Sequence, residues 1–317
     1  MKKILLSIAL SFAFTGYSQT TEAESDLKSQ NADTTEGWKV GGVFGVNFTQ
    51  VGLNNWAAGG QSSVSLNSLF DVYANYKKGK SSWDNNLTLG YGVLKQGEDA
   101  DWIKSDDRIL LNSKYGRKAI KNWYYAGLLN FKSQFAPGYN LPDDSTKISD
   151  FMAPGYFLGA IGMDYKPSDN FTVFISPVTA KLTVVNNTLL SDAGAFGVDS
   201  GKTTRLEVGG YLRMMYKREI MENVTYQTNL DLFSNYSEDP DHIDVNWDNL
   251  LSMKVNKYIS ATFSTSLIYD HDIKILETKS DGTAKTDSNG NPVIGPRTQF
   301  KYVLAIGFQY NFGASKK

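Results

Sequence analysis

The last stretch of the chain, from Gln299 to Gly313, alternates between two kinds of side chain (Q-F-K-Y-V-L-A-I-G-F-Q-Y-N-F-G). Because successive side chains of a strand point to opposite faces, one face is apolar and aromatic throughout, while the other is mostly small or polar. A soluble sandwich would bury the apolar face against a second sheet. A transmembrane barrel would turn it toward lipid and leave the polar face in the lumen.

Twelve strand-like runs follow one another along the chain, and most of them alternate in the same way. Most are also longer than the roughly 3–10 residues usual for strands of globular proteins. A tilted membrane strand needs about 9–11 residues for the hydrocarbon core alone, so the length favours the membrane alternative. The predicted strands are 38–49, 62–77, 82–95, 106–117, 122–135, 155–166, 170–184, 203–218, 223–236, 243–256, 258–271 and 298–312.

The connections between these runs alternate between short and long. Lys78 to Lys80 and Pro167 to Asp169 are short, whereas Ala136 to Pro154 and Asp272 to Arg297 are long. Membrane barrels have short periplasmic turns and long extracellular loops, and an even strand number leaves both termini in the periplasm. We therefore predict an all-β fold: a single transmembrane antiparallel β-barrel of about 12 strands, with short periplasmic turns and long extracellular loops.

Aromatic rings fall on the apolar face at the short-turn end of nearly every predicted strand. A soluble sandwich or lipocalin-like barrel has no reason to align them, whereas a membrane barrel carries such a girdle at the interface. The short turns are basic and the long loops acidic. These charges could be two solvated rims, or turns that face phospholipid and loops that attract cations. The girdle consists of Trp38, Tyr76, Trp83, Tyr115, Trp123, Tyr125, Tyr165, Phe171, Tyr216, Tyr226, Tyr310 and Phe312.

The chain opens with basic residues, a short apolar run and small residues before Gln19. That order is typical of a cleaved secretory signal peptide. We assign 1–18 to the signal peptide, 19–37 to a flexible periplasmic leader, 38–313 to the barrel and 314–317 to a short C-terminal tail. These features predict an outer-membrane location with membrane lipid as a partner, and the net charge of −1 argues against nucleic acid.

The predicted lumen receives charges of both signs. Eight strands leave an interior that side chains just fill, and about 16–18 leave an aqueous channel, so twelve strands allow either. Arg205, Glu207 and Arg213 could pair with Asp231 on the next strand. The lumen could be braced by such ion pairs, or it could conduct. The candidate lumen residues are Asp71, Lys132, Arg205, Glu207, Arg213, Asp231, Asp248 and Lys301.

One loop, Gln50 to Gln61, differs from the others because it is not acidic and carries Trp56 among small residues. Exposed apolar loops are uncommon unless they pack on something. Asn54, Asn55 and Trp56 are therefore a candidate docking loop for other outer-membrane proteins. The same residues could instead form a constriction in the lumen or pack over the barrel rim.

The stretch L-N-N-W-A-A-G-G from Leu53 to Gly60, the preceding G-V-N-F-T-Q and the closing Y-N-F resemble an uncharacterised Bacteroidota family of outer-membrane β-barrels, known only as a domain of unknown function. The resemblance implies a porin-like barrel in the outer membrane and assigns no activity or site residues. The C-terminal strand is the expected contact with the barrel assembly machinery. One departure is that Gly313 to Lys317 extend past the terminal aromatic residue.

Catalytic and metal chemistry is poorly supported by the sequence. His242 and His271 fall at the outer ends of neighbouring predicted strands and could approach each other, but nothing fixes a ligand geometry. His271 with Ser264 or Ser266 would be needed for a lipase-type site, and those serines are predicted to face the lumen. The segment Asp287 to Asn291 is interpreted as a turn rather than a calcium loop. We expect no enzyme, cofactor or metal site.

Two function classes remain at this stage. The mixed charges of the lumen and the Trp56 loop favour a structural or accessory barrel of an outer-membrane assembly. The alternative is a passive or selective pore for small solutes, which twelve strands permit.

Overall fold

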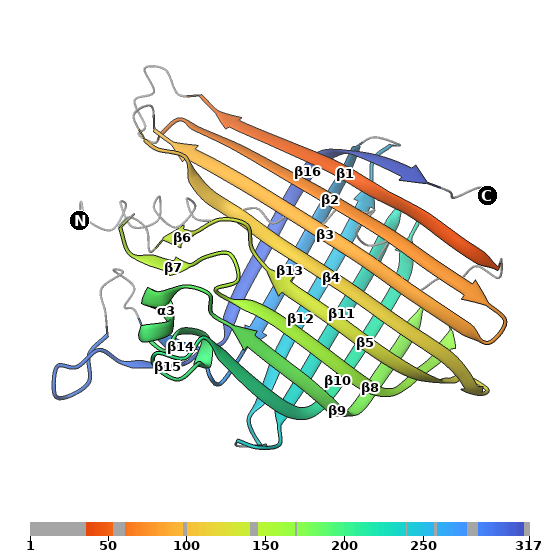
Figure 1. The fold of residues 1–317 in the computed structure, drawn as a ribbon. Coiled ribbons are helices and arrows are strands. Elements are labelled where there is room, and N and C mark those ends of the chain that lie inside the picture. The colour runs from red at the N-terminus through yellow and green to blue at the C-terminus, as the bar shows by residue number, and fades with distance from the viewer. Residues whose placement is uncertain are drawn as a thin grey trace.

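The computed structural model describes residues 36–52, 61–97, 100–139, 145–168, 170–238, 240–256, 259–277 and 285–313. Long antiparallel strands dominate it and wind into one ring (Figure 1). The ring strands are β1 (Gly37–Val51), β2 (Ser63–Lys78), β3 (Ser81–Gln96), β4 (Ile103–Ile120), β5 (Trp123–Ser133), β8 (Gly155–Ser168), β9 (Phe171–Val184), β10 (Thr204–Met221), β11 (Val224–Asn235), β12 (Ile243–Lys254), β13 (Ile259–Tyr269) and β16 (Gln299–Gly313).

The ring closes where the first strand meets the last. Its order is β1-β16-β13-β12-β11-β10-β9-β8-β5-β4-β3-β2, so that consecutive ring strands pair as antiparallel neighbours and β1 pairs with both β2 and β16. The predicted barrel of twelve antiparallel strands is therefore confirmed. The predicted rhythm of connections is also present, with short turns at one end of the barrel and long loops at the other. We call these the short-turn end and the long-loop end.

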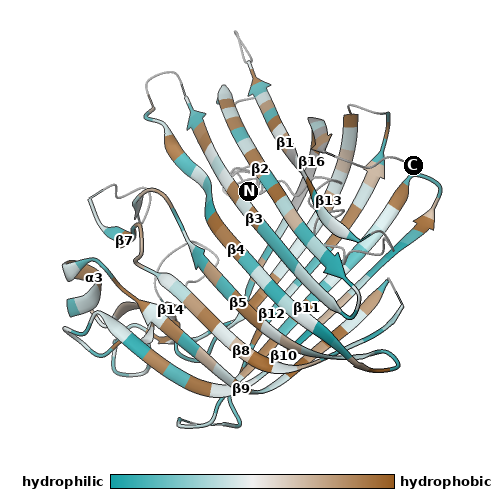
Figure 2. Ribbon diagram, turned by 45° about the vertical axis from the view of Figure 1, so that its right-hand side comes forward, coloured by the Kyte–Doolittle hydropathy of each residue, from teal (hydrophilic) through white to brown (hydrophobic). Residues whose placement is uncertain are grey.

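The polarity of the barrel is the reverse of that of a soluble protein. On the outside, Leu129 is 66% exposed and Ile161 is 73% exposed, although both are fully apolar. On the inside, Asp71 is 0% exposed and Asp164 is 1% exposed. The alternation of the two kinds of residue along each strand is visible in Figure 2. An apolar exterior around a polar interior is the pattern of a transmembrane barrel, in which lipid covers the exposed residues.

Aromatic side chains of the predicted girdle lie close together at the short-turn end. The ring centroids of Trp38 and Tyr76 are 5.2 Å apart, those of Trp38 and Trp83 are 5.7 Å apart, and those of Trp123 and Tyr165 are 4.9 Å apart. Aromatic residues prefer the membrane–water interface because their rings are amphipathic. No helix in the described part of the chain is long and apolar enough to cross a membrane.

The long-loop end carries small elements that the sequence analysis did not predict. Two short hairpins and two short helices lie there (Figure 1). The α-helix is capped by Asn187, whose side-chain oxygen accepts a hydrogen bond from the Leu190 amide. These elements are β6 (Gly138–Tyr139), β7 (Lys147–Ser149), α3 (Thr188–Asp192), the 3₁₀ helix η2 (Ala195–Gly197), β14 (Lys274–Leu276) and β15 (Ile294–Pro296).

The loops that follow β5 and β9 pack against each other. Ala153 and Val185 are completely buried and form an apolar cluster with Leu190 and Val198. Asp150 on the first loop accepts a hydrogen bond from Asn187 on the second. A hydrogen bond from the Lys147 ammonium, outside the membrane-spanning strands, lowers the pKa of the Asp150 carboxyl. The two loops therefore form a small ordered cap beside the barrel mouth.

Replacing Leu129 with Arg tests whether lipid covers the outside of the barrel. An exposed Leu→Arg change in a soluble barrel would alter stability by less than about 0.5 kcal/mol. In a membrane, an arginine near the bilayer midplane costs about 2–4 kcal/mol. We expect the larger loss when unfolding from phospholipid vesicles is followed by urea titration. Leu129→Met is the control and should unfold at the wild-type urea concentration.

Candidate functional site

The lumen holds the charged residues of the barrel, and the structure places all eight predicted lumen residues on its inward face. Asp71 and Glu207 are buried there, whereas Lys132 and Asp248 are exposed. Some of the eight come together, as Arg205 does with Glu207 and Arg213 with Asp231. Lys132 stands apart at the end of β5. The predicted docking residues Asn54, Asn55 and Trp56 lie outside the described residues.

The largest group of charges lies at the long-loop end, and we call it the outer charge cluster. Lys181 of β9 contacts three carboxylates: Asp244 at 2.9 Å, Glu207 at 3.5 Å and Asp270 at 3.8 Å. Asp244 is the second residue of β12, which β10 and β11 separate from β9 in the ring. The lysine therefore reaches across the lumen rather than along the wall. The outer charge cluster consists of Lys181, Arg205, Glu207, Glu238, Asp244, Asp270 and Asp272.

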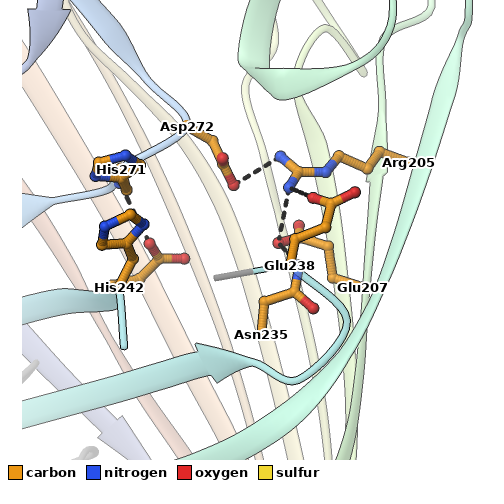
Figure 3. A pocket seen from close by; sticks show the side chains of 8 residues that line it. Arg205, Glu207, Asn235, Glu238, His242, His271 and Asp272 are labelled. Carbon is orange, nitrogen blue, oxygen red and sulfur yellow. Dashed lines mark hydrogen bonds and ion pairs between the residues drawn. The ribbon is translucent and has the colours of Figure 1, made fainter. Parts of the chain in front are cut away.

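Arg205 is the second cation of the outer charge cluster. Its guanidinium bonds Asp272 at 2.6 Å, contacts Glu207 at 3.7 Å and pairs with Glu238 (Figure 3). Asp272 belongs to the loop after β13, so this arginine ties two loops to the barrel wall. A guanidinium can bind several carboxylates because it has five donors in a fixed plane.

A small cavity of about 50 Å³ lies among these residues. On one side of it, the rings of His242 and His271 stack with centroids 3.7 Å apart and planes 16° apart (Figure 3). The sequence analysis expected these two histidines to approach each other. Within the described ranges, no group of three or more His, Cys, Asp and Glu side chains is arranged to hold a metal ion. The nearby carboxylates instead bind Lys181 and Arg205.

A second group of charges lies near the short-turn end, and we call it the inner charge cluster. Asp164 of β8 accepts from Lys114 at 3.0 Å and from the Thr172 hydroxyl at 2.6 Å. Lys166 contacts Asp164 at 3.4 Å and Asp84 at 4.0 Å. Asp84 is on β3, which β4 and β5 separate from β8. This cluster therefore also spans the lumen.

An apolar cluster fills the lumen wall between the two charge clusters. The sequence analysis did not predict this cluster, because it assigned the apolar face of each alternating strand to lipid and the polar face to the lumen. Phe174 is 1% exposed and packs near Tyr211, with ring centroids 6.3 Å apart. The Tyr211 hydroxyl donates to Asp231 at 2.9 Å, and Asp231 also contacts Arg213 at 3.5 Å. The cluster consists of Ala126, Leu128, Ala160, Phe174, Tyr211 and Phe233, with Leu158 packed against it.

A third contact crosses the lumen from the last strand. Lys301 of β16 lies 3.9 Å from Asp106 of β4, and Arg108 lies 3.8 Å from the same carboxylate. Three strands, β1, β2 and β3, separate β16 from β4 in the ring. Lys301 keeps 46% of its side chain exposed, whereas Lys181, Lys114 and Lys166 keep 14%, 16% and 18%. It is therefore more accessible to water than the lysines of the two clusters.

The serine and calcium chemistries that the sequence analysis considered and rejected can be compared with the local geometry. Ser266 donates its hydroxyl proton to Asp248 at 2.6 Å rather than to His271. The Asp287 carboxylate accepts from the backbone amides of Asn289 and Asn291, at 2.8 Å and 2.9 Å. Such a carboxylate closes an Asx-type turn, in agreement with the turn interpretation of this segment.

A family described as "Protein of unknown function (DUF3078)" matches residues 48–139, in agreement with the predicted resemblance to a family of unknown function. The match covers less than half of the chain. No curated protein matches.

Three solved structures have similar overall forms. An outer membrane channel, COG4313, from Pseudomonas putida F1 has a TM-score of 0.40 at 9% identity, over 89% of this chain and 97% of that chain. The NanC porin has a TM-score of 0.36 at 7% identity, over 87% and 99%. The translocator domain of the autotransporter NalP from Neisseria meningitidis has a TM-score of 0.35 at 10% identity, over 91% and 92%. These scores are low, and the conclusions below rest on the residues of this chain.

Replacing Lys181 with Met tests the outer charge cluster. The change leaves three carboxylates without their shared cation, and breaking a buried ion pair in this way costs about 3–5 kcal/mol. We expect a loss of that order in the free energy of unfolding, measured by urea titration in vesicles. Lys132→Met removes an exposed inward lysine and should cost less than about 0.5 kcal/mol. Equal effects of the two changes would contradict the cluster's role.

Proposed function

We propose that this protein is an outer-membrane barrel with a structural or accessory role in an outer-membrane assembly, and that its lumen does not form a wide pore. The observation that carries the proposal is the set of ion pairs between strands that are not neighbours. Lys181 joins β9 to β12, Lys166 joins β8 to β3 and Lys301 joins β16 to β4. Side chains that meet at 2.9–4.0 Å across a lumen occupy the space that a wide aqueous pore needs.

The location follows from the exterior of the barrel and from the sequence. The exposed apolar belt requires a membrane, and the N-terminal pattern of residues 1–18 is that of a secretory signal peptide. Closed barrels with short turns at one end are characteristic of the outer membrane. We accordingly assign the short-turn end to the periplasm and the long-loop end, with its cap and outer charge cluster, to the outside.

Conductance in a planar bilayer tests whether the lumen is closed. Purified mature protein, shown to be folded by its heat-dependent shift on a gel, is added under asymmetric salt. We expect the membrane to stay silent, because charged side chains bridge the lumen at both ends. A double variant, Lys166→Ala with Lys181→Ala, removes one bridge at each end and should produce open steps if these side chains are the obstruction.

A narrow solute pore is the second candidate, and one observation favours it. Three buried oxygen atoms on β11 and β12 have no hydrogen-bond partner among the described residues: Gln227 Oε1, Asn229 Oδ1 and Ser252 Oγ. Buried polar atoms of this kind are normally satisfied by water, which would place water along this side of the lumen.

Stable open steps from the wild-type protein would overturn the closed lumen in favour of this pore. In that case Arg213→Ala should shift the reversal potential, because Arg213 lies on the lumen wall beside Asp231. An unchanged reversal potential would remove Arg213 from the path of the ions.

The predicted docking loop gives a separate test of the accessory role. Trp56→Ala should leave folding and membrane insertion unchanged, because the change lies between two predicted strands rather than within one. If the loop docks a partner, proteins that co-purify with the wild type in mild detergent should be lost from the variant. Asn55→Ala is a neighbouring variant for comparison. Unchanged co-purification for both would exclude this loop as the docking element.

A further inference from the structure

The seam between the first and last strands is only partly closed. β1 pairs with β2 along its whole length, from Gly37 to Val51. It pairs with β16 only from Gly41 to Val46, opposite Gly313 to Phe308. On its other side, β16 pairs with β13 from Gln299 to Phe308. In the described chain, the first part of β16 therefore has a ladder partner on one side only.

The two strands separate at a definite point. A Cβ atom added to Gly307 would overlap Oδ1 of Asn47, so β1 and β16 are still in contact there. Beyond this point no ladder pair joins the described residues of the two strands. Figure 1 shows the far end of β1 well apart from the start of β16. Among the described residues, the unpaired edge of β16 therefore runs from Gln299 to Ile306, in the half of the barrel nearer the long loops.

Lipid cannot satisfy a free strand edge. Unpaired backbone N–H and C=O groups cost several kcal/mol each in hydrocarbon, which is why membrane barrels close completely. An amphiphile lying along the edge would leave most of these groups unpaired. The occupant that complements them is another extended polypeptide, which offers alternating donors and acceptors at the spacing of the edge.

A second, independent feature lies next to this edge on the outside of the barrel. A row of polar side chains crosses strands whose other outward residues are mostly apolar. The Asn249 amide donates to Thr265 at 3.2 Å, the Tyr226 hydroxyl donates to Asn249 at 2.8 Å, and the Trp247 indole donates to Thr228 at 2.9 Å. In cross-strand register the row is Tyr216, Thr228, Asn249, Thr265 and Tyr302.

This polar row ends on β16 itself, at Tyr302, which is exposed. Hydrogen bonds satisfy Thr228, Asn249 and Thr265, whereas among the described residues none reaches the Tyr302 hydroxyl. A hydroxyl without a partner is costly in hydrocarbon. The row and the free edge thus meet at the same strand, and both are better matched by polypeptide than by lipid.

A second copy of this chain cannot be the occupant if the two copies pair through their β16 edges. Two barrels with the same orientation in the membrane are related by an axis along the membrane normal. Their β16 strands, each tilted by about 35–45°, would then cross at a large angle and could not form a ladder. A strand that runs antiparallel to β16, in the direction of β1, fits the antiparallel order of the whole barrel.

We propose that the free edge of β16, from Gln299 to Ile306, binds a β-strand from another outer-membrane polypeptide, antiparallel to β16. The proposal rests on the accessory role proposed above and identifies the strand edge through which this barrel binds its partner. The partner strand has apolar or hydroxyl residues on its outward face, beside Phe300 and Tyr302. On its inward face it carries a carboxylate beside Lys301, because opposite charges on adjacent strands stabilise each other.

Cysteine pairs test first whether the barrel instead closes its own seam. The chain has no cysteine, so the two introduced cysteines can form a disulfide only with each other within one chain. Val46→Cys with Phe308→Cys lies within the paired part and should form a disulfide in intact cells. Gln50→Cys with Leu304→Cys continues the same register beyond Gly307 and should remain reduced. If the second pair oxidises as completely as the first, β1 itself completes the ladder and the proposal is wrong.

Site-specific photocrosslinking then tests the occupant. A benzophenone amino acid is placed in turn at Phe300, Tyr302 and Ile306 in cells, with Phe157 on the fully paired strand β8 as the control position. The proposal requires that all three positions crosslink one polypeptide. The crosslinked residues of that partner, found by mass spectrometry, must run in reverse order, with separations of two residues and then four that match the three probe positions. Phe157 should give no such product.

Other outcomes overturn the proposal. Crosslinks only to lipid, scattered crosslinks without the reverse order, or crosslinks to a second copy of this chain would each exclude a partner strand at this edge. None of them would bear on the silent lumen, which conductance measures separately. A failure of this inference is therefore distinguishable from a failure of the proposed function.

Discussion

Backbone hydrogen bonding in a water-free environment is the constraint on which the rest of this structure depends. Hydrocarbon offers no donors or acceptors, so a chain that crosses it with strands must pair every strand on both sides. The ring of twelve strands meets this requirement almost everywhere. Once the wall is a single sheet, each strand has one face toward lipid and one toward the lumen. The apolar exterior and the polar interior then follow from the period of two.

Ion pairs hold the lumen on both sides of the apolar cluster around Phe174. Lys181 lies among three carboxylates and Asp164 between two lysines, so cations and anions are matched locally although the chain is almost neutral overall. Desolvation makes single buried charges costly, and only close pairing offsets that cost. Because the partners sit on distant strands, the pairs also resist changes in the cross-section of the barrel. A lumen built in this way preserves its shape, which supports the proposed accessory role.

The strands were predictable from the sequence and their contacts across the lumen were not. Alternation and loop length are local signals, and they placed all twelve ring strands. The sequence analysis did not assign Lys181 to the lumen. The pairing register of β9 shifts against both of its neighbours, near Ile161 of β8 and near Gly209 of β10. Across these shifts the inward-facing residues of β9 change from even-numbered to odd-numbered positions. Phe174 and Lys181 differ in sequence parity, yet both side chains face inward. A fixed period of two cannot follow such a shift.

Other features depend on three-dimensional proximity that no local pattern encodes. Lys301 was assigned to the lumen from the sequence, but its approach to Asp106 depends on the tilt and stagger of the strands between them. The cap at the long-loop end depends on the buried cluster around Ala153 and Val185, whose members come from two loops. The approach of His242 and His271 was an exception that the sequence did indicate. Both residues were placed at the outer ends of neighbouring predicted strands, and such ends lie side by side.

The seam between β1 and β16 is the one place where the governing constraint is not met within the described chain. Every other junction of the ring joins strands that are consecutive among the ring strands, so a turn or loop holds the pair together. This junction alone joins the two ends of the chain, and its ladder is also the shortest. The shortest ladder of the ring is thus the one that no turn supports. In the proposed barrel with a closed lumen, the wall is the surface through which the protein can act, and this edge is the part of the described wall with unused hydrogen-bonding capacity.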